Sequence, residues 1–173
     1  MFIKMMETDI MSLLELMDYT TDRFYIVFDE EDGKKQIKEI FTKLFDEYKN
    51  AEISDFLTQS EVIVAFGRGY HPEKGIDDIL NICKKLNAHY ATTRPIQDMG
   101  LVDETKVLGK TALSVNPKLY IAFGLSGSVQ HLGSINANDI IAINNNKNSA
   151  IFSHAKFAIL GDARDVAHFI ANI

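Results

Sequence analysis

The feature that most constrains the fold is a series of short, uniformly apolar runs that begins at Val62. The runs lack the polar–apolar alternation of a strand that is exposed on one face, and they cover Val62–Phe66, Leu119–Phe123, Ile140–Ile143 and Phe157–Leu160. Helical patterns near residues 75–87 and from about Ala163, with a short extended piece at His89–Thr92, separate or follow them. Buried strands that alternate with helices are typical of a parallel sheet covered on both faces. We therefore expect an α/β fold with a parallel, Rossmann-like sheet.

The segment before residue 60 has a different character. It contains a helical apolar stripe over residues 5–19, a strand at Phe24–Phe28 and an amphipathic helix whose apolar face runs from Ile37 to Tyr48. Residues 1–60 carry a net charge of −7, whereas residues 61–173 carry +1. We expect residues 1–60 to be a short helix–strand–helix extension that packs on a main domain of residues 61–173. The main domain is then the better host for an anionic ligand.

Composition narrows the class of protein. A net charge of −6 argues against a general nucleic-acid binder. The single cysteine, Cys83, cannot form an intramolecular disulfide, fits a reducing compartment and lies at the spacing of a helix core position. Acidic residues interrupt any signal-peptide pattern near the N-terminus, and no run approaches the roughly 18 apolar residues of a membrane span. A cytoplasmic location without membrane contact is expected.

Ligands of open parallel sheets bind beyond the carboxyl ends of the strands, so the residues that follow each predicted strand are the candidates. Polar or glycine residues follow five of them: Gly67-Arg68-Gly69, Thr93-Arg94, Gly124 to His131, Asn144 and Asp162. The glycine turn before Ser128 suits a phosphate, because unpaired N–H groups at a helix start attract anions. Alternatives stay open at this point: a plain tight turn at Gly67, a helix N-cap at Asp162 and a structural histidine at His131.

Several other motifs are incomplete. Gly109-Lys110-Thr111 lacks the upstream glycine of a P-loop, and Gly124 to Gly127 lacks the spacing of a hydrolase nucleophile elbow. The acidic turn Asp29 to Asp32 lacks the ligand spacing of a calcium loop, and the other histidines have no metal-ligand companions. Neither a nucleotide triphosphatase nor a hydrolase is favoured.

Several motifs in register give the chain a family resemblance. The run from Leu119 to Leu132, Leu-Tyr-Ile-Ala-Phe-Gly-Leu-Ser-Gly-Ser-Val-Gln-His-Leu, resembles the signature of the C-terminal FAD-binding domain of the electron transfer flavoprotein alpha subunit. Val62–Gly69, Ala91–Arg94 and Gly109–Thr111 resemble further motifs of that domain in the same order. The resemblance covers about residues 62–165 and implies a fold of the deoxyhypusine-synthase-like NAD/FAD-binding type with FAD as cofactor.

The resemblance also implies roles for individual residues. The pyrophosphate and adenosine would contact Arg68, Ser126, Gly127 and Asn144, with Asp162 near the adenine, and Gly69 would belong to the same cofactor site. The flavin ring would be surrounded by Thr93, Arg94, Thr111, Gln130 and His131. Backbone N–H groups would come from Leu108, Gly109, Lys110 and Thr111 and from Ser126, Gly127, Ser128, Val129, Gln130 and His131.

Two substitutions distinguish the chain from the family pattern. Lys110 stands where the family has glutamine, and Ala112 where it has glycine. A lysine beside the ring would make the bound flavin more oxidising, so Lys110→Gln is expected to lower the midpoint potential. Because the resemblance begins only near residue 62, we also expect a homo-oligomer in which the acidic extension covers exposed surface.

The resemblance implies electron transport as the function: a flavoprotein that acts as a one-electron carrier, with a beta-subunit-like protein or a dehydrogenase as its redox partner. The first alternative is a non-redox module of the same fold that binds an adenine nucleotide. The second is a small flavin-dependent reductase, for which the sequence offers no substrate-site residues. A carrier is therefore favoured over an enzyme with its own substrate.

Overall fold

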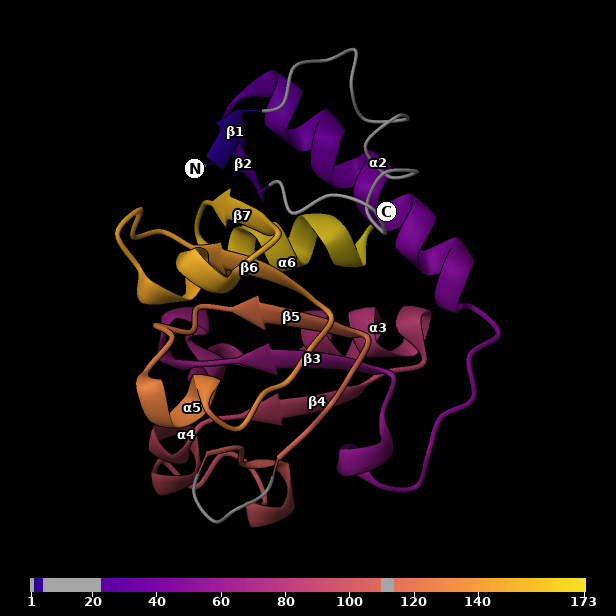
Figure 1. Ribbon diagram of the computed structural model, residues 1–173, viewed down its shortest axis with the longest axis vertical. Helices are drawn as coiled ribbons and strands as arrows, with labels where there is room; N and C mark the ends of the chain where they lie inside the picture. Colours follow the sequence, from indigo (N-terminus) through magenta and orange to yellow (C-terminus); the bar gives the residue numbers. More distant parts are fainter. Residues whose placement is uncertain (1, 5–22, 110–113) are drawn as a thin grey trace.

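The fold is known from a computed structural model that describes residues 2–4, 23–109 and 114–173. Its centre is one parallel sheet with the strand order β1-β2-β7-β6-β5-β3-β4 (Figure 1). The strands are β1 (Phe2–Lys4), β2 (Arg23–Val27), β3 (Val62–Phe66), β4 (His89–Thr92), β5 (Leu119–Phe123), β6 (Asp139–Asn144) and β7 (Phe157–Leu160). Every neighbouring pair is parallel, which confirms the α/β prediction.

The helices are α2 (Glu31–Tyr48), α3 (Asp77–Leu86), α4 (Arg94–Asp98), α5 (Val129–Leu132) and α6 (Ala163–Ala171). Short 3-10 turns lie at Leu57–Gln59, Arg68–Tyr70, Pro72–Lys74, Glu104–Lys106 and Ala150–His154. The main-domain strands and the helices near 75–87 and from Ala163 thus lie where the apolar patterns predict them. The helix expected over residues 5–19 falls outside the described residues, and β1 was not predicted.

The segment before residue 60 shares the sheet of the main domain. Strand β2 pairs with β7 from Phe24–Phe157 to Val27–Leu160, so it continues the same hydrogen-bonded ladder. Helix α2 buries Ile37, Ile40, Phe41 and Leu44, the i, i+3, i+4 stripe of a helix with one apolar face. That face packs against β2 and against α3 and α6.

The two faces of the sheet have different cores. One, the helix-covered face, lies under α2, α3 and α6, and its strands contribute large side chains such as Val64, Phe66, Ile121 and Phe157. The other, the loop-covered face, receives Leu108, Val115, Leu125, Ile151 and Phe152 from irregular segments. On this face five adjacent strands, β4, β3, β5, β6 and β7, bring five alanines into register across the sheet: Ala91, Ala65, Ala122, Ala142 and Ala158. Small side chains leave room for loops to cross close to the strands.

Candidate functional site

All parallel strands end on the same edge of the sheet, and this edge gathers most of the predicted site residues. Arg68 begins the turn after β3, Thr93 and Arg94 follow β4, Ser126 to His131 follow β5, Asn144 ends β6 and Asp162 follows β7. Parallel topology, rather than proximity in sequence, brings them to one place. In Figure 1 the arrowheads of β3, β5 and β4 point to this edge, where the α4 and α5 segments lie.

The turns after β3 and β5 pack against each other backbone to backbone. Gly67 and Gly69 donate their N–H groups to Phe123 and Gly124 at 3.0 and 3.1 Å. Gly124 has φ +65°, and a Cβ there would lie 2.4 Å from Gly69 C and Tyr70 N. The Gly-x-Gly motif after β3 therefore has a packing role in this chain, whether or not Gly69 also contacts a ligand.

The segment from Ser126 to Gln130 lies at the site edge, with Gly127 buried and its other four residues exposed. Gly127 has φ +80° and packs on the Ile151 backbone, while Ile151 donates to the Ser126 carbonyl at 3.2 Å. Ser128 caps α5, and its hydroxyl accepts from the His131 N–H at 3.4 Å. Within the described part of the chain, no backbone carbonyl accepts from the N–H of Gly127 or Ser128. Two unpaired N–H groups beside exposed serine hydroxyls form a suitable donor set for an anion.

His131 is turned inward, unlike its neighbours Val129 and Gln130, and is only 4% exposed. Its Nε2 lies 2.7 Å from the Tyr120 hydroxyl, in the core of the loop-covered face. Burial lowers the pKa of His131 to about 4, with the Leu108 backbone acting weakly in the opposite direction. The ring is therefore neutral at pH 7. Its Nδ1 is buried and finds no hydrogen-bond partner among residues 23–109 and 114–173.

The loop that precedes the undescribed residues 110–113 passes close to this histidine. Leu108 donates its N–H to the Thr92 carbonyl at 2.9 Å, and Gly109 has φ +85°. A Cβ on Gly109 would lie 3.2 Å from the Cα of His131. The structure thus brings Leu108 and Gly109 against the α5 segment, as a shared ligand site requires. The predicted contacts of Lys110 and Thr111 lie outside the described residues.

The two predicted arginines lie on exposed turns. Arg94 donates from Nε to Asp98 Oδ1 at 2.6 Å, across one turn of α4, and both side chains are more than half exposed. Arg68 is exposed and forms no ion pair with the described residues. Thr93 is half-buried at the start of α4. Arg68 is the freer of the two cations for binding a phosphate.

Two of the predicted contacts already serve the protein itself. Asn144 is buried and donates from Nδ2 to the Leu125 carbonyl at 2.9 Å, and its Oδ1 accepts from the Asn146 N–H at 2.9 Å. Asp162 caps α6 and accepts from the N–H groups of Arg164 and Asp165 at 2.9 and 3.1 Å. The N-cap considered for Asp162 is thus present. Contacts of these two residues with adenosine stay predictions.

Sequence reasoning missed two residues that shape the site. One is Tyr120, and the signal for it was the single hydroxyl in an otherwise apolar strand, because a buried hydroxyl needs a partner. The other is Arg164, which donates to the carbonyls of His71 and Gly75 at 3.2 and 2.9 Å. Its guanidinium lies 5.0 Å from the centre of the Tyr70 ring. Arg164 therefore ties α6 to the turn after β3.

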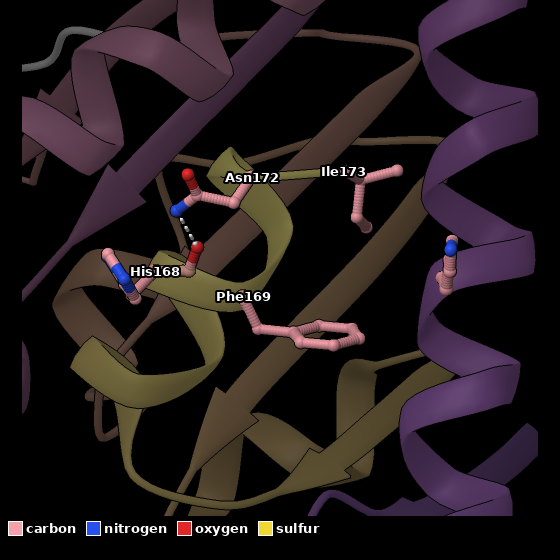
Figure 2. A pocket seen from close by; sticks show the side chains of 5 residues that line it. His168, Phe169, Asn172 and Ile173 are labelled. Atoms are coloured by element: carbon pink, nitrogen blue, oxygen red, sulfur yellow. Dashed lines mark hydrogen bonds between the residues drawn. The ribbon is translucent and has the colours of Figure 1, made fainter.

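Two surface cavities lie away from this edge. One, of about 310 Å³, is lined by Lys38 on α2 and by His168, Phe169, Asn172 and Ile173 at the end of α6 (Figure 2). The other, of about 490 Å³, is lined by Lys49, Asn81, Lys84, Lys85 and Ala171. Both belong to the helical side, and neither is lined by a predicted site residue.

Two further classes of site receive no support from the described residues. They contain no cluster of three or more His, Cys, Asp or Glu side chains placed to hold a metal ion. Cys83 is buried, and burial raises the pKa of its thiol to about 12, so it stays protonated as a core residue. Within the same residues, no helix has the length and apolar character needed to cross a membrane.

The donors at the carboxyl edge fit a dinucleotide cofactor such as FAD. The N–H groups of Gly127 and Ser128 and the guanidinium of Arg68, which have no partner among the described residues, match the two charges of a pyrophosphate. The buried Nδ1 of His131, without a partner in residues 23–109 and 114–173, matches a heteroaromatic ring that offers a hydrogen-bond acceptor. When FAD is bound, it supplies electron transfer chemistry that no side chain can.

Comparison with known proteins gives the same assignment. Residues 56–136 match the family model described as the electron transfer flavoprotein FAD-binding domain. The chain is 34% identical over 148 residues to the electron transfer flavoprotein subunit alpha of Thermoanaerobacterium thermosaccharolyticum. The aligned region covers 85% of this chain and 44% of that protein.

Two related proteins share shorter regions. Protein FixB of Azotobacter vinelandii is 38% identical over 105 residues, 60% of this chain and 29% of that protein. Protein FixB of Bradyrhizobium diazoefficiens is 37% identical over 116 residues, 66% of this chain and 31% of that protein. The chain thus spans less than half the length of these relatives. Through the FAD-binding domain of these proteins, the chain is related to the electron transfer flavoprotein alpha subunits.

Proposed function

We propose that this protein binds FAD at the carboxyl edge of the sheet and acts as a one-electron carrier. The observation that carries the proposal is the buried Nδ1 of His131, which has no partner among the described residues and belongs to the segment that follows Gly127 and Ser128. A buried polar atom without a partner costs about 1–3 kcal/mol, so a ligand that supplies the partner would be favoured.

Different groups of the chain would bind the pyrophosphate and the flavin ring. Arg68 and the N–H groups of Gly127 and Ser128 would hold the pyrophosphate. Thr93, Arg94 and Gln130 would border the ring, and the neutral imidazole of His131 would offer one hydrogen bond to it. The Asp98 carboxylate would hold Arg94 in place while leaving part of its charge for the cofactor.

The partners follow from the relatives and are part of the proposal. A beta-subunit-like protein or a dehydrogenase would exchange electrons with the bound cofactor, and the location would be the cytoplasm. We also propose that residues 1–60 form an extension of the main domain and that the chain is a homo-oligomer. Sedimentation of a stable monomer would contradict the last point.

The first test is FAD binding to the purified protein. The expected result is a yellow preparation that releases FAD on denaturation and, once stripped, binds added FAD in an absorbance titration. Arg68→Ala should weaken binding about 10–100-fold, because a hydrogen bond to a charged group contributes about 1.5–3 kcal/mol. Lys84→Ala, on the helical side of the molecule, is the matched control and should bind FAD as the wild type does.

Other outcomes distinguish the alternatives. A colourless protein that binds adenine nucleotides but not FAD would replace the proposal with the non-redox binding module. Electron delivery to an artificial one-electron acceptor would support the carrier. Turnover of an organic substrate without any partner protein would instead indicate a reductase.

A further inference from the structure

Hydrogen bonds hold both the side chains of the Tyr120–His131 pair and the backbone of His131. Tyr120 is fully buried in β5, and its hydroxyl makes one hydrogen bond among the described residues, to His131 Nε2 at 2.7 Å. The backbone of His131 is also held in place. The Ser134 hydroxyl and the Ser134 N–H both donate to the His131 carbonyl, at 2.7 and 3.1 Å. Backbone and side chain together fix where the two ring nitrogens lie.

The number of buried groups that each tautomer leaves without a hydrogen bond indicates which nitrogen carries the proton of the neutral ring. If Nε2 carried it and donated to Tyr120, the tyrosine proton would have no acceptor in the described structure and Nδ1 would be an unpaired acceptor. If the tyrosine donates to Nε2, its own proton is satisfied and the ring proton lies on Nδ1. The second arrangement leaves fewer buried groups unpaired and is therefore more stable.

The surroundings of the ring agree with this assignment. The Leu108 backbone raises the pKa of His131, as a carbonyl close to a ring N–H does, although Nδ1 makes no hydrogen bond within the described residues. Because Nε2 faces the tyrosine, this influence favours a proton on Nδ1. Tyr120 itself holds its proton firmly, since complete burial raises its pKa well above 10. It can donate a hydrogen bond to the ring without giving up the proton.

We propose that Tyr120 is a positioning residue: its hydroxyl bond to Nε2 keeps the proton of His131 on Nδ1, so that Nδ1–H is the donor presented to the bound cofactor. That the ligand is FAD depends on the proposed function. The tautomer of His131 does not depend on it, because the tautomer is a property of the ligand-free protein. Tyr120 acts through His131 and has no contact of its own with the cofactor.

The test is nitrogen NMR of the ligand-free protein labelled with ¹⁵N-histidine. The chain has five histidines, so His131→Gln assigns the resonances by their loss. The expected spectrum shows a protonated Nδ1 and an unprotonated, hydrogen-bonded Nε2. A proton on Nε2 in the wild-type protein overturns the inference without any variant, so the test survives if a variant fails to fold.

Two matched variants separate positioning from packing. Tyr120→Phe should reduce the Nδ1–H to Nε2–H ratio by about fivefold or more, the change expected for one hydrogen bond. Tyr70→Phe removes another fully buried hydroxyl, one in the core of the helix-covered face, and should leave the ratio unchanged. An unchanged ratio in Tyr120→Phe would show that Leu108 alone sets the tautomer and would overturn the role of Tyr120.

Addition of FAD to the same sample tests the link to the cofactor. The Nδ1 resonance should move while the Nε2 resonance stays near its ligand-free position. If FAD binds and Nδ1 does not respond, the donor role is overturned while the proposed function stands. If FAD does not bind, the proposed function fails together with the cofactor role, and the ligand-free spectrum still decides whether Tyr120 sets the tautomer.

Discussion

The helix-covered and loop-covered faces of the sheet are built from the same strands but do different work. On the helix-covered face, alternate residues such as Val64, Ile121 and Phe157 pack against the layer formed by α2, α3 and α6. On the loop-covered face, their neighbours are the row of alanines, and the cover is made of turns that end at the carboxyl edge. The larger apolar core thus lies on the helix-covered face and the proposed binding site on the loop-covered side.

The difference shows how a parallel sheet can hold irregular loops rigidly. A loop without regular structure must satisfy its own backbone, and here the turns after β3, β5 and β6 bond to one another. Small side chains beneath them allow close approach, and glycines allow backbone to meet backbone. The loops are therefore positioned by the strands although they are not part of the sheet.

The helix-covered face should show the largest loss of stability on truncation. Phe157 is 1% exposed, and its ring lies 5.4 Å from that of Phe24. Phe157→Ala should lower the free energy of unfolding by about 3–5 kcal/mol, because it removes a large buried side chain and leaves a cavity. Urea unfolding measures the loss. The control Phe56→Ala, at a residue that is 62% exposed, should stay within about 0.5 kcal/mol of the wild type.

A change on the loop-covered side should affect the site as well as stability. Gly124→Ala should cost roughly 2–5 kcal/mol, from about 1–2 for a positive φ and about 1–3 for the clash with the Gly69 and Tyr70 backbone. The matched control is Gly100→Ala, which has a similar φ of +72° but nothing within 4 Å of the added Cβ.

Calorimetry and FAD titration of both variants test the comparison. Gly124→Ala should weaken FAD binding along with stability, whereas Gly100→Ala should lose only the smaller, conformational part of the stability. Equal losses in the two variants would show that the interlocked turns add nothing to the fold.

The sequence predicts the two faces unequally well. Apolar runs gave β3, β5 and β7 with their observed bounds, because burial on both faces leaves a continuous apolar pattern. The carboxyl-edge location of Arg68, Arg94 and Ser126 followed from parallel topology alone. Periodicity reports burial, however, and says nothing about which turns meet. The contact of Gly69 with Gly124 and the bond between Tyr120 and His131 depend on tertiary packing and were not predicted.

The buried histidine makes the loop-covered side sensitive to acid. In the unfolded chain His131 takes up a proton near pH 6.5, whereas in the folded chain it does so only near pH 4. Protons therefore favour the unfolded state in this window, and the folded protein should lose about 3 kcal/mol of stability as the pH falls from 6.5 to 4.

Denaturant titrations across this pH range measure the effect. His131→Gln should be less sensitive to acid by that amount, since glutamine does not titrate. His154→Gln, at an exposed histidine, should show the same change in unfolding free energy with pH as the wild type. A His131→Gln slope equal to that of the wild type would mean that His131 is protonated as readily in the folded protein as in the unfolded chain.

Asp162 gives the smallest effect and lies between the end of β7 at Leu160 and the start of α6 at Ala163. Its carboxylate caps two N–H groups, so Asp162→Ala should cost about 1 kcal/mol of stability through the helix start alone. Asp162→Asn is the matched variant, because asparagine caps a helix about as well but has no charge. Asp162→Asn should have about the stability of the wild type. If the carboxylate also contacts the adenine end of FAD, both Asp162→Ala and Asp162→Asn should bind FAD more weakly than the wild type. If Asp162→Asn has wild-type FAD affinity, the carboxylate charge contributes nothing to binding, and the residue belongs to the helical side of the molecule alone.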